Sequence, residues 1–159
     1  IPVIFIIENN KYGMGTSVER ASASRDLSQN GAAWGIPGEQ VNGMDVASVR
    51  EAGERAVAHC RAGKGPYLLE MKTYRYRGHS MSDPAKYRTR EEVQKMRETP
   101  DCIETARKAL LDDFGVTEAD LKVIDDEVKA IVQDSADFAQ ESPEPPESEL
   151  MTDILVEVG

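Results

Sequence analysis

The sequence contains few cysteines and relatively few basic residues. Its 159 residues include only Cys60 and Cys102, which are too few for a disulfide framework and have no metal-ligand spacing. We therefore expect a reducing compartment. Acidic residues outnumber basic ones by 29 to 19, which gives a formal net charge of −10. Because affinity for nucleic acid depends on clustered lysine and arginine, this charge argues against nucleic acid as a partner.

The sequence also lacks a long apolar run and an initiator methionine. No stretch is long and apolar enough to span a membrane, so we expect no membrane partner. The chain begins at Ile1, inside an apolar segment, and a first strand with nothing before it to pair with is a poor start for a domain. We therefore interpret the chain as part of a longer protein, although its length is that of one ordinary domain.

The first part of the chain alternates predicted strands and helices. The expected elements are a strand over residues 1–7, a helix over 27–34, a strand over 40–42, a helix that begins after the N-cap Asp45 and ends at Gly63, and a strand over 67–73. The first strand is a continuous apolar run, as expected of a strand buried on both faces. This alternation is typical of a parallel α/β layer.

The second part of the chain contains no predicted strand. Residues 74–92, "YRYRGHSMSDPAKYRTREE", have no apolar period and are predicted to form a loop. Helices are expected over residues 89–97 and 101–114, followed by a long helix capped by Thr117 with one apolar face. We predict a first domain over residues 1–98, which includes the loop 74–92, and a helical extension with a C-terminal tail over 99–159.

A polar cluster, "ENNKYGMG" at residues 8–15, ends the first predicted strand. In open parallel sheets, ligands bind beyond the carboxyl ends of the strands. An asparagine side-chain oxygen and a backbone carbonyl are hard, neutral ligands suited to a Mg²⁺ ion that a carboxylate and a diphosphate also hold. Gly13 and Gly15 would let the backbone approach such a ligand closely. The alternative is a plain turn, because asparagine and glycine are the commonest turn residues.

His79 is the second candidate functional residue. It lies between Gly78 and Ser80, in a stretch that is rich in arginine and lysine. An imidazole can donate a hydrogen bond or move a proton near neutral pH, although a lone histidine is more often a surface or structural residue. In an acidic chain, the local excess of basic residues indicates contact with an anion or ion pairs that order the loop.

Three segments of the chain together resemble the alpha subunits of the thiamine-diphosphate-dependent first component of the pyruvate dehydrogenase complex. They are "ENNKYGMGTSVERASAS" (8–24), "TYRYRGHSMSDP" (73–84) and "YRTREE" (87–92). The resemblance follows nearly the whole chain in order and is weakest in the helical C-terminal third. In that family the cofactor-binding motif begins with Gly-Asp-Gly and closes with Asn-Asn. Only the closing half is present here, so the resemblance is to the C-terminal part of the subunit.

The resemblance implies roles for four residues. Asn10 would give its side-chain oxygen, and Tyr12 its backbone carbonyl, to the Mg²⁺ that anchors thiamine diphosphate. His79 would act at the active-site mouth, as a catalytic and cofactor-contacting residue near the incoming lipoyl arm. Ser80 matches the position that regulatory kinases modify in mitochondrial members. However, "DPAKYRTR" lacks the serine that those members carry before the tyrosine, which favours a bacterial source and puts kinase control in doubt.

The resemblance also implies a fold, a reaction and partners. The fold would be α/β, the second half of a doubly wound, thiamine-diphosphate-binding parallel-sheet domain with a helical C-terminal extension. The reaction would be oxidative decarboxylation of pyruvate with acetyl transfer to the lipoyl group of the acyltransferase core. The partners would be the beta subunit, in an alpha2beta2 heterotetramer, and the lipoyl-bearing acyltransferase. The location would be cytoplasmic in a bacterium or the mitochondrial matrix in a eukaryote.

Two alternatives remain open at this point. Within the same family, the chain would belong to a branched-chain 2-oxoacid or acetoin dehydrogenase. In a different class, it would be a non-catalytic phosphate-binding or assembly module that lacks the metal carboxylate altogether. A Gly-Asp-Gly motif upstream of Ile1 would distinguish the enzyme from the module. In either enzyme, we expect this chain alone to be inactive.

Overall fold

The computed structural model describes residues 1–99, 101–152 and 154. The chain divides into two compact units, residues 1–113 and 114–159, which are described separately below. The domain division expected from the sequence, 1–98 and 99–159, stays a prediction. The predicted C-terminal tail lies partly outside the described residues.

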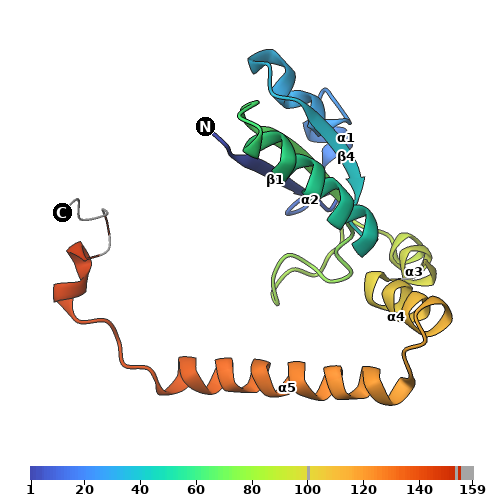
Figure 1. Cartoon of the computed structure of the whole chain (residues 1–159), viewed down its shortest axis with the longest axis vertical. Coiled ribbons are helices and arrows are strands. Elements are labelled where there is room, and N and C mark those ends of the chain that lie inside the picture. Colours follow the sequence, from blue (N-terminus) through green and yellow to red (C-terminus); the bar gives the residue numbers. More distant parts are fainter. Residues whose placement is uncertain (100, 153, 155–159) are drawn as a thin grey trace. The chain divides into compact units, whose positions relative to one another are not determined.

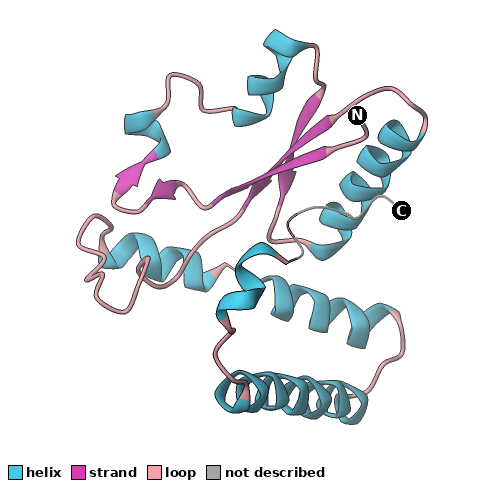
Figure 2. Ribbon diagram, turned by 90° about the vertical axis from the view of Figure 1, so that its left-hand side faces the viewer, coloured by secondary structure: helices cyan, strands magenta, loops and turns pink. Residues whose placement is uncertain are grey.

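The first unit is built around a parallel sheet, drawn in magenta in Figure 2. The sheet consists of β1 (Ile4–Asn9), β4 (Gly38–Asn42) and β5 (Tyr67–Lys72), with β5 in the middle. This arrangement confirms the predicted α/β class. The doubly wound fold stays a prediction. The register places Asn9 and Asn42 beside Lys72, so the three strands end level with one another. Residues that follow these strand ends therefore lie together at the carboxyl end of the sheet.

The core lies between this sheet and helix α2 (Val46–Arg61). Ala52 and Ala56 of the helix are fully buried against Leu69 and Met71 of the central strand, and their small side chains allow a close approach. The helix begins as predicted, because the Asp45 side chain accepts the Ala47 N–H at 3.0 Å. By packing on the sheet, α2 holds in place the strands at whose carboxyl ends the polar cluster lies.

The prediction that the first strand is buried on both faces is wrong for the part of the chain that the structure describes. Strand β1 begins at Ile4 rather than Ile1, and Phe5 and Ile6 are 47% and 59% exposed. The reason is that β1 is at the edge of the three-stranded sheet and pairs there only with β5. The apolar residues of β1 are suited to burial, but no segment among the described residues covers Phe5 and Ile6.

Short elements and a long loop connect these parts. They are strands β2 (Tyr12–Gly13) and β3 (Thr16–Ser17), which pair as an antiparallel hairpin, helix α1 (Val18–Ala21) and the 3-10 helix η1 (Leu27–Trp34). Helices α3 (Arg90–Glu98) and α4 (Cys102–Asp113) follow the loop and complete the first unit. The predicted helices are confirmed to within one or two residues at each end.

The second unit contains α5 (Glu118–Glu141), which Figure 1 shows as one uninterrupted helix, and the 3-10 helix η2 (Glu147–Met151). Thr117 caps α5 as predicted, and it forms a reciprocal capping box with Asp120. The predicted apolar stripe is present, but Ile131 and Phe138 are 68% and 74% exposed. None of the helices in the described part combines the length and apolar character that a membrane crossing needs.

Candidate cofactor site

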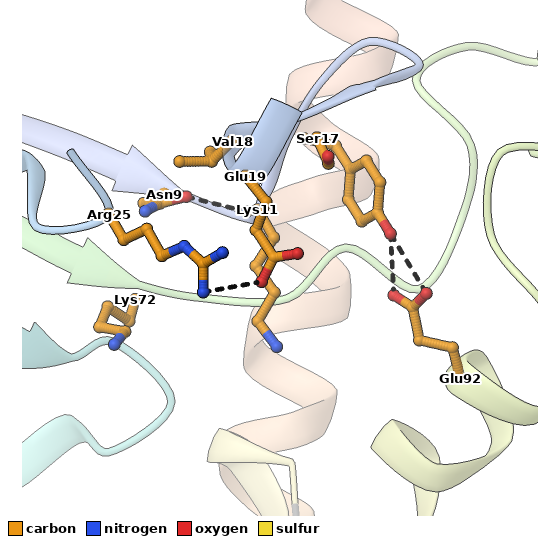
Figure 3. A pocket seen from close by; sticks show the side chains of 9 residues that line it. Asn9, Lys11, Ser17, Val18, Glu19, Arg25, Lys72 and Glu92 are labelled. Atoms are coloured by element: carbon orange, nitrogen blue, oxygen red, sulfur yellow. Dashed lines mark hydrogen bonds and ion pairs between the residues drawn. The ribbon is translucent and has the colours of Figure 1, made fainter. Parts of the chain in front are cut away.

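A cleft of about 410 Å³ lies at the carboxyl ends of β1 and β5 (Figure 3). The strand-end residues Asn9 and Lys72 line it together with Lys11, residues of the hairpin and α1, Arg25 and Glu92. Across its wall, Arg25 and Glu19 form an ion pair at 3.9 Å. The cleft therefore lies at the carboxyl end of the sheet, where the sequence predicts a ligand.

Two interlocked turns shape the polar cluster after β1. The Asn9 Oδ1 atom accepts the Lys11 N–H at 2.9 Å, and the Asn10 Oδ1 atom accepts the Tyr12 N–H at 3.1 Å. Lys11 has a φ of 72°, a left-handed conformation that is uncommon for a residue with a side chain. The structure thus brings the predicted ligands Asn10 and Tyr12 together. Tyr12 lines the cleft, whereas Asn10 does not.

The orientation of the Tyr12 carbonyl fits a metal ligand. The Val18 N–H donates to the Lys11 carbonyl at 2.9 Å, so Lys11 and Val18 form a hydrogen-bonded pair of the hairpin. Such pairs alternate along antiparallel strands, so the next pair, Tyr12 with Ser17, is not hydrogen-bonded. The N–H and carbonyl of Tyr12 therefore point away from β3, to the side on which its N–H meets Asn10.

The turn accordingly presents two neutral oxygens. The Asn10 Oδ1 atom accepts one hydrogen bond and keeps a second lone pair, and the Tyr12 carbonyl lies on the same side of the chain. Oxygens of this type suit Mg²⁺. Across residues 1–99, 101–152 and 154, no group of three or more histidine, cysteine or carboxylate side chains is arranged to hold a metal ion. The turn would thus be one part of a ligand set.

His79 lies on the loop, is exposed and does not line the cleft. Its backbone N–H donates to Asp83 Oδ2 at 2.7 Å, and its Nδ1 atom is 3.1 Å from an Arg75 guanidinium nitrogen. Because a guanidinium only donates, Nδ1 accepts this bond, and the proton of a neutral ring is then on Nε2. The neighbouring Ser80 is also exposed, with its hydroxyl oxygen 3.0 Å from that of Ser82.

Tyr87 connects the His79 loop to the hairpin. Its hydroxyl donates to Asp83 Oδ2 at 2.8 Å, and its ring centroid is 5.3 Å from that of Tyr12. A Cβ atom on Gly15 would lie 3.2 Å from the Tyr87 ring. Tyr87 therefore packs closely on Gly15, whereas a Cβ atom on Gly13 would meet no atom within 4 Å; the approach of a ligand to these two glycines stays a prediction.

Arg88 is a site residue that the sequence did not single out. It is 8% exposed, and its guanidinium carbon lies 5.5 to 5.8 Å from the ring centroids of Tyr12, Tyr74 and Tyr87. It donates to the backbone carbonyls of Arg75 and Arg77, the latter at 2.9 Å. Cation–π contact and charged hydrogen bonds here join the two ends of the loop. In the sequence, the feature that could have indicated this role is an arginine within a tyrosine-rich segment.

Glu92 completes this cluster from helix α3. Its carboxylate accepts hydrogen bonds from the hydroxyls of Tyr12, at 3.1 Å, and Tyr74, at 3.3 Å. Burial, followed by the proximity of Glu92, raises the pKa of both tyrosines above its ordinary value. The raised pKa widens the range of pH above neutral over which both hydroxyls stay protonated and keep donating. The hairpin, the loop and α3 are thereby held together beside the cleft.

Asp83 is the acceptor on which the fold of the His79 loop depends. The backbone N–H groups of His79 and Ala85 and the Tyr87 hydroxyl all donate to it, and these bonds lower its pKa below the ordinary value of 3.8. A lowered pKa in the folded state means that the stabilisation is fully present above the ordinary pKa and is lost as the pH falls through the folded one.

We expect Asp83→Asn to open the loop at neutral pH, because an amide replaces one acceptor oxygen with a donor that faces other donors. Hydrogen exchange should show lower protection at the His79 and Ala85 amides. In the unsubstituted protein, the same protection factors should stay constant from pH 7 to pH 5 and fall below about pH 4. Asp45→Asn is the matched control, because asparagine still caps α2 and the loop should not respond. Equal protection in Asp83→Asn and the control would contradict the prediction.

Comparison with known proteins assigns the class. A model of the family described as "Dehydrogenase E1 component" matches residues 1–148, so the chain belongs to the dehydrogenase E1 component family. Among curated proteins, it is 64% identical to the pyruvate dehydrogenase E1 component subunit alpha of Rhizobium meliloti, over 98% of this chain and 45% of that protein. The chain therefore spans about half the length of the curated relatives that it matches.

Two further relatives carry the same name. The pyruvate dehydrogenase E1 component subunit alpha of Zymomonas mobilis is 54% identical over 98% of this chain and 44% of that protein. The testis-specific mitochondrial form from Rattus norvegicus is 51% identical over 94% of this chain and 38% of that protein. These relatives confirm the resemblance that the motifs indicate, and they include both bacterial and mitochondrial proteins.

Proposed function

We propose that this chain is the C-terminal part of the alpha subunit of the pyruvate dehydrogenase E1 component, and that it supplies part of a thiamine diphosphate and Mg²⁺ site. The observation that carries the proposal is the turn at Asn10 and Tyr12. It offers two neutral oxygens at the carboxyl ends of parallel strands, beside a cleft lined by Lys11, Arg25 and Lys72. These cations suit the negative charge of a diphosphate.

In this proposal, each element of the site has one task. Asn10 and Tyr12 would hold the Mg²⁺ ion, and His79 would donate a hydrogen bond from its Nε2–H group to the cofactor diphosphate or the incoming lipoyl group. When bound, the cofactor supplies the electron sink that decarboxylation needs. Arg88 and Asp83 keep the loop folded, so that His79 is presented from a defined backbone. The doubly wound fold around the sheet belongs to the same proposal.

The substrate is inferred from the relatives. Those described above are named for pyruvate dehydrogenase and are 51 to 64% identical to this chain. We therefore infer oxidative decarboxylation of pyruvate with acetyl transfer to the lipoyl group of the acyltransferase. The branched-chain 2-oxoacid, acetoin and non-catalytic alternatives gain no support. The inferred partners are the beta subunit, in an alpha2beta2 heterotetramer, and the lipoyl-bearing acyltransferase.

Ser80 is a candidate site for regulation. A phosphate on the exposed Ser80 would add a charge of roughly −1.5 to −2 next to His79, which would disturb the loop. The compartment stays a prediction, the cytoplasm of a bacterium or the mitochondrial matrix, because relatives occur in both kinds of organism.

The test uses the full-length alpha subunit assembled with its beta subunit and an artificial electron acceptor. We expect turnover of pyruvate that requires both thiamine diphosphate and Mg²⁺. Pyruvate should exceed 3-methyl-2-oxobutanoate and acetoin in kcat/KM by roughly tenfold or more, because added methyl groups change the fit of a pocket. A preference for either competitor would favour the alternative enzymes. A folded assembly that turns over none of the three would favour a non-catalytic module.

A further inference from the structure

Glu70 is a fully buried carboxylate at the centre of the sheet. It lies on the middle strand β5, between the apolar residues Leu69 and Met71, and its exposed fraction is 0%. The mechanism proposed above does not use it. A buried carboxylate is costly unless hydrogen bonds compensate for its lost hydration, so its partners show why it is tolerated.

All three partners of Glu70 are N–H donors from different elements. The Asn9 side-chain amide of β1 donates to Oε1 at 2.6 Å. The Gln40 side-chain amide of β4, at 2.9 Å, and the Ser28 backbone N–H of η1, at 3.0 Å, donate to Oε2. Both carboxylate oxygens therefore act as acceptors, and Glu70 joins the two outer strands through the central one.

The bond to Asn9 determines how that side chain is oriented. Because the Asn9 amide nitrogen is held by Glu70, its oxygen faces the Lys11 N–H, which it accepts at 2.9 Å. That bond supports the left-handed Lys11, whose φ is 72°. Lys11 in turn lies between Asn10 and Tyr12. The buried carboxylate is thus connected, through one amide, to the backbone that places both proposed metal ligands.

We propose that Glu70 is a positioning residue, which sets the geometry of the metal-binding turn by fixing the amide orientation of Asn9. The inference rests on the proposed function, because it takes the turn at Asn10 and Tyr12 as the site of the cation. It predicts that two bonds to the same carboxylate have different effects. Loss of the bond to Asn9 disturbs the turn, whereas loss of the bond to Gln40 affects only the sheet.

The principal variant is Glu70→Gln in the full-length alpha–beta assembly. The backbone N–H of Ser28 cannot turn, so the new amide oxygen faces it and the new amide nitrogen faces Asn9. Asn9 must then rotate its own amide, which brings its nitrogen against the Lys11 N–H.

Gln40→Leu is the matched control, since it removes a bond to the same carboxylate on the side away from the turn. Asn9→Ser is a second route, because serine still offers an acceptor to Lys11 but is too short to reach Glu70.

Two readouts separate positioning from stability. Hydrogen exchange reports the protection of the Lys11 and Tyr12 amides without cofactor. Electron paramagnetic resonance of Mn²⁺, used in place of Mg²⁺ with thiamine diphosphate, reports the affinity for the cation. We expect Glu70→Gln and Asn9→Ser to lower Mn²⁺ affinity by about tenfold or more and to reduce both amide protections. Gln40→Leu should lower the melting temperature and leave both readouts unchanged.

The outcomes distinguish the inference from the proposed function. Equal exchange at Lys11 in Glu70→Gln and Gln40→Leu would overturn the inference, as would unchanged readouts in Asn9→Ser. An unsubstituted assembly that binds no Mn²⁺ in the presence of thiamine diphosphate would overturn the proposed function. In that case, the exchange measurement still decides whether Glu70 holds the turn.

Discussion

Replacing Asn10 by alanine is expected to weaken Mg²⁺-dependent binding of thiamine diphosphate to the full-length assembly by about a hundredfold. The substitution removes the amide oxygen proposed as a metal ligand, and it also removes the acceptor that holds the Tyr12 N–H at 3.1 Å. Both proposed ligands are thus affected by one change. A hundredfold loss corresponds to about 2.7 kcal/mol, which is within the range expected for loss of a charged interaction. Isothermal titration calorimetry with MgCl₂ and thiamine diphosphate measures it.

The chain contains a matched control for this substitution. Asn42 ends the neighbouring strand β4, and its Oδ1 atom accepts the Met44 N–H at 3.1 Å, the same turn with the same bond length. Asn42→Ala should therefore have a similar effect on the local turn and leave cofactor affinity within about threefold. Loss of affinity to the same extent in both variants would mean that the assignment of Asn10 as a ligand is wrong.

Local sequence signals predicted the elements and the place of the candidate site. Asp45 and Thr117 begin their helices as expected, because an N-cap acts through bonds to the next two or three residues. The polar cluster at Asn9 and Asn10 follows a strand, and a strand end is a position that the sequence reports directly. Strand β1 shows the limit, since the exposure of Phe5 depends on what else covers the sheet.

The network around Glu70 could not be predicted from the sequence. A charged residue inside an apolar strand is a recognisable anomaly, but its partners Asn9 and Gln40 are 61 and 30 residues away. They meet because β5 lies between β1 and β4, an order that no local pattern specifies. The same holds for Arg88, whose partner Tyr12 is on the hairpin. Long-range polar contacts therefore fix the details of a site whose location local patterns already indicate.

Replacing Arg88 by alanine is expected to release the loop that carries His79. The guanidinium is buried, donates to the carbonyls of Arg75 and Arg77, and lies over three tyrosine rings. Two hydrogen bonds to a charged group and the cation–π contacts together suggest a local loss of roughly 3 kcal/mol. Since every 1.4 kcal/mol is a factor of ten, trypsin should then cleave after Arg75 and Arg77 about a hundred times faster in the full-length assembly.

Further comparisons make this prediction specific to the contacts of Arg88. Arg90→Ala removes a neighbouring, exposed arginine and should leave cleavage at Arg75 unchanged. Arg88→Lys keeps the charge, but one ammonium group cannot reach both carbonyls while stacking on the rings, so an intermediate rate is expected. Affinity for Mg²⁺ should fall little in Arg88→Ala, because the hydrogen bonds of Asn9 and Asn10 stay in place.

Thiamine diphosphate is expected to slow cleavage of the unsubstituted loop, and it should not restore protection without Arg88. Equal cleavage rates in Arg88→Ala and Arg90→Ala would show that the loop is held by other contacts, and His79 would then lose the support that its proposed role requires.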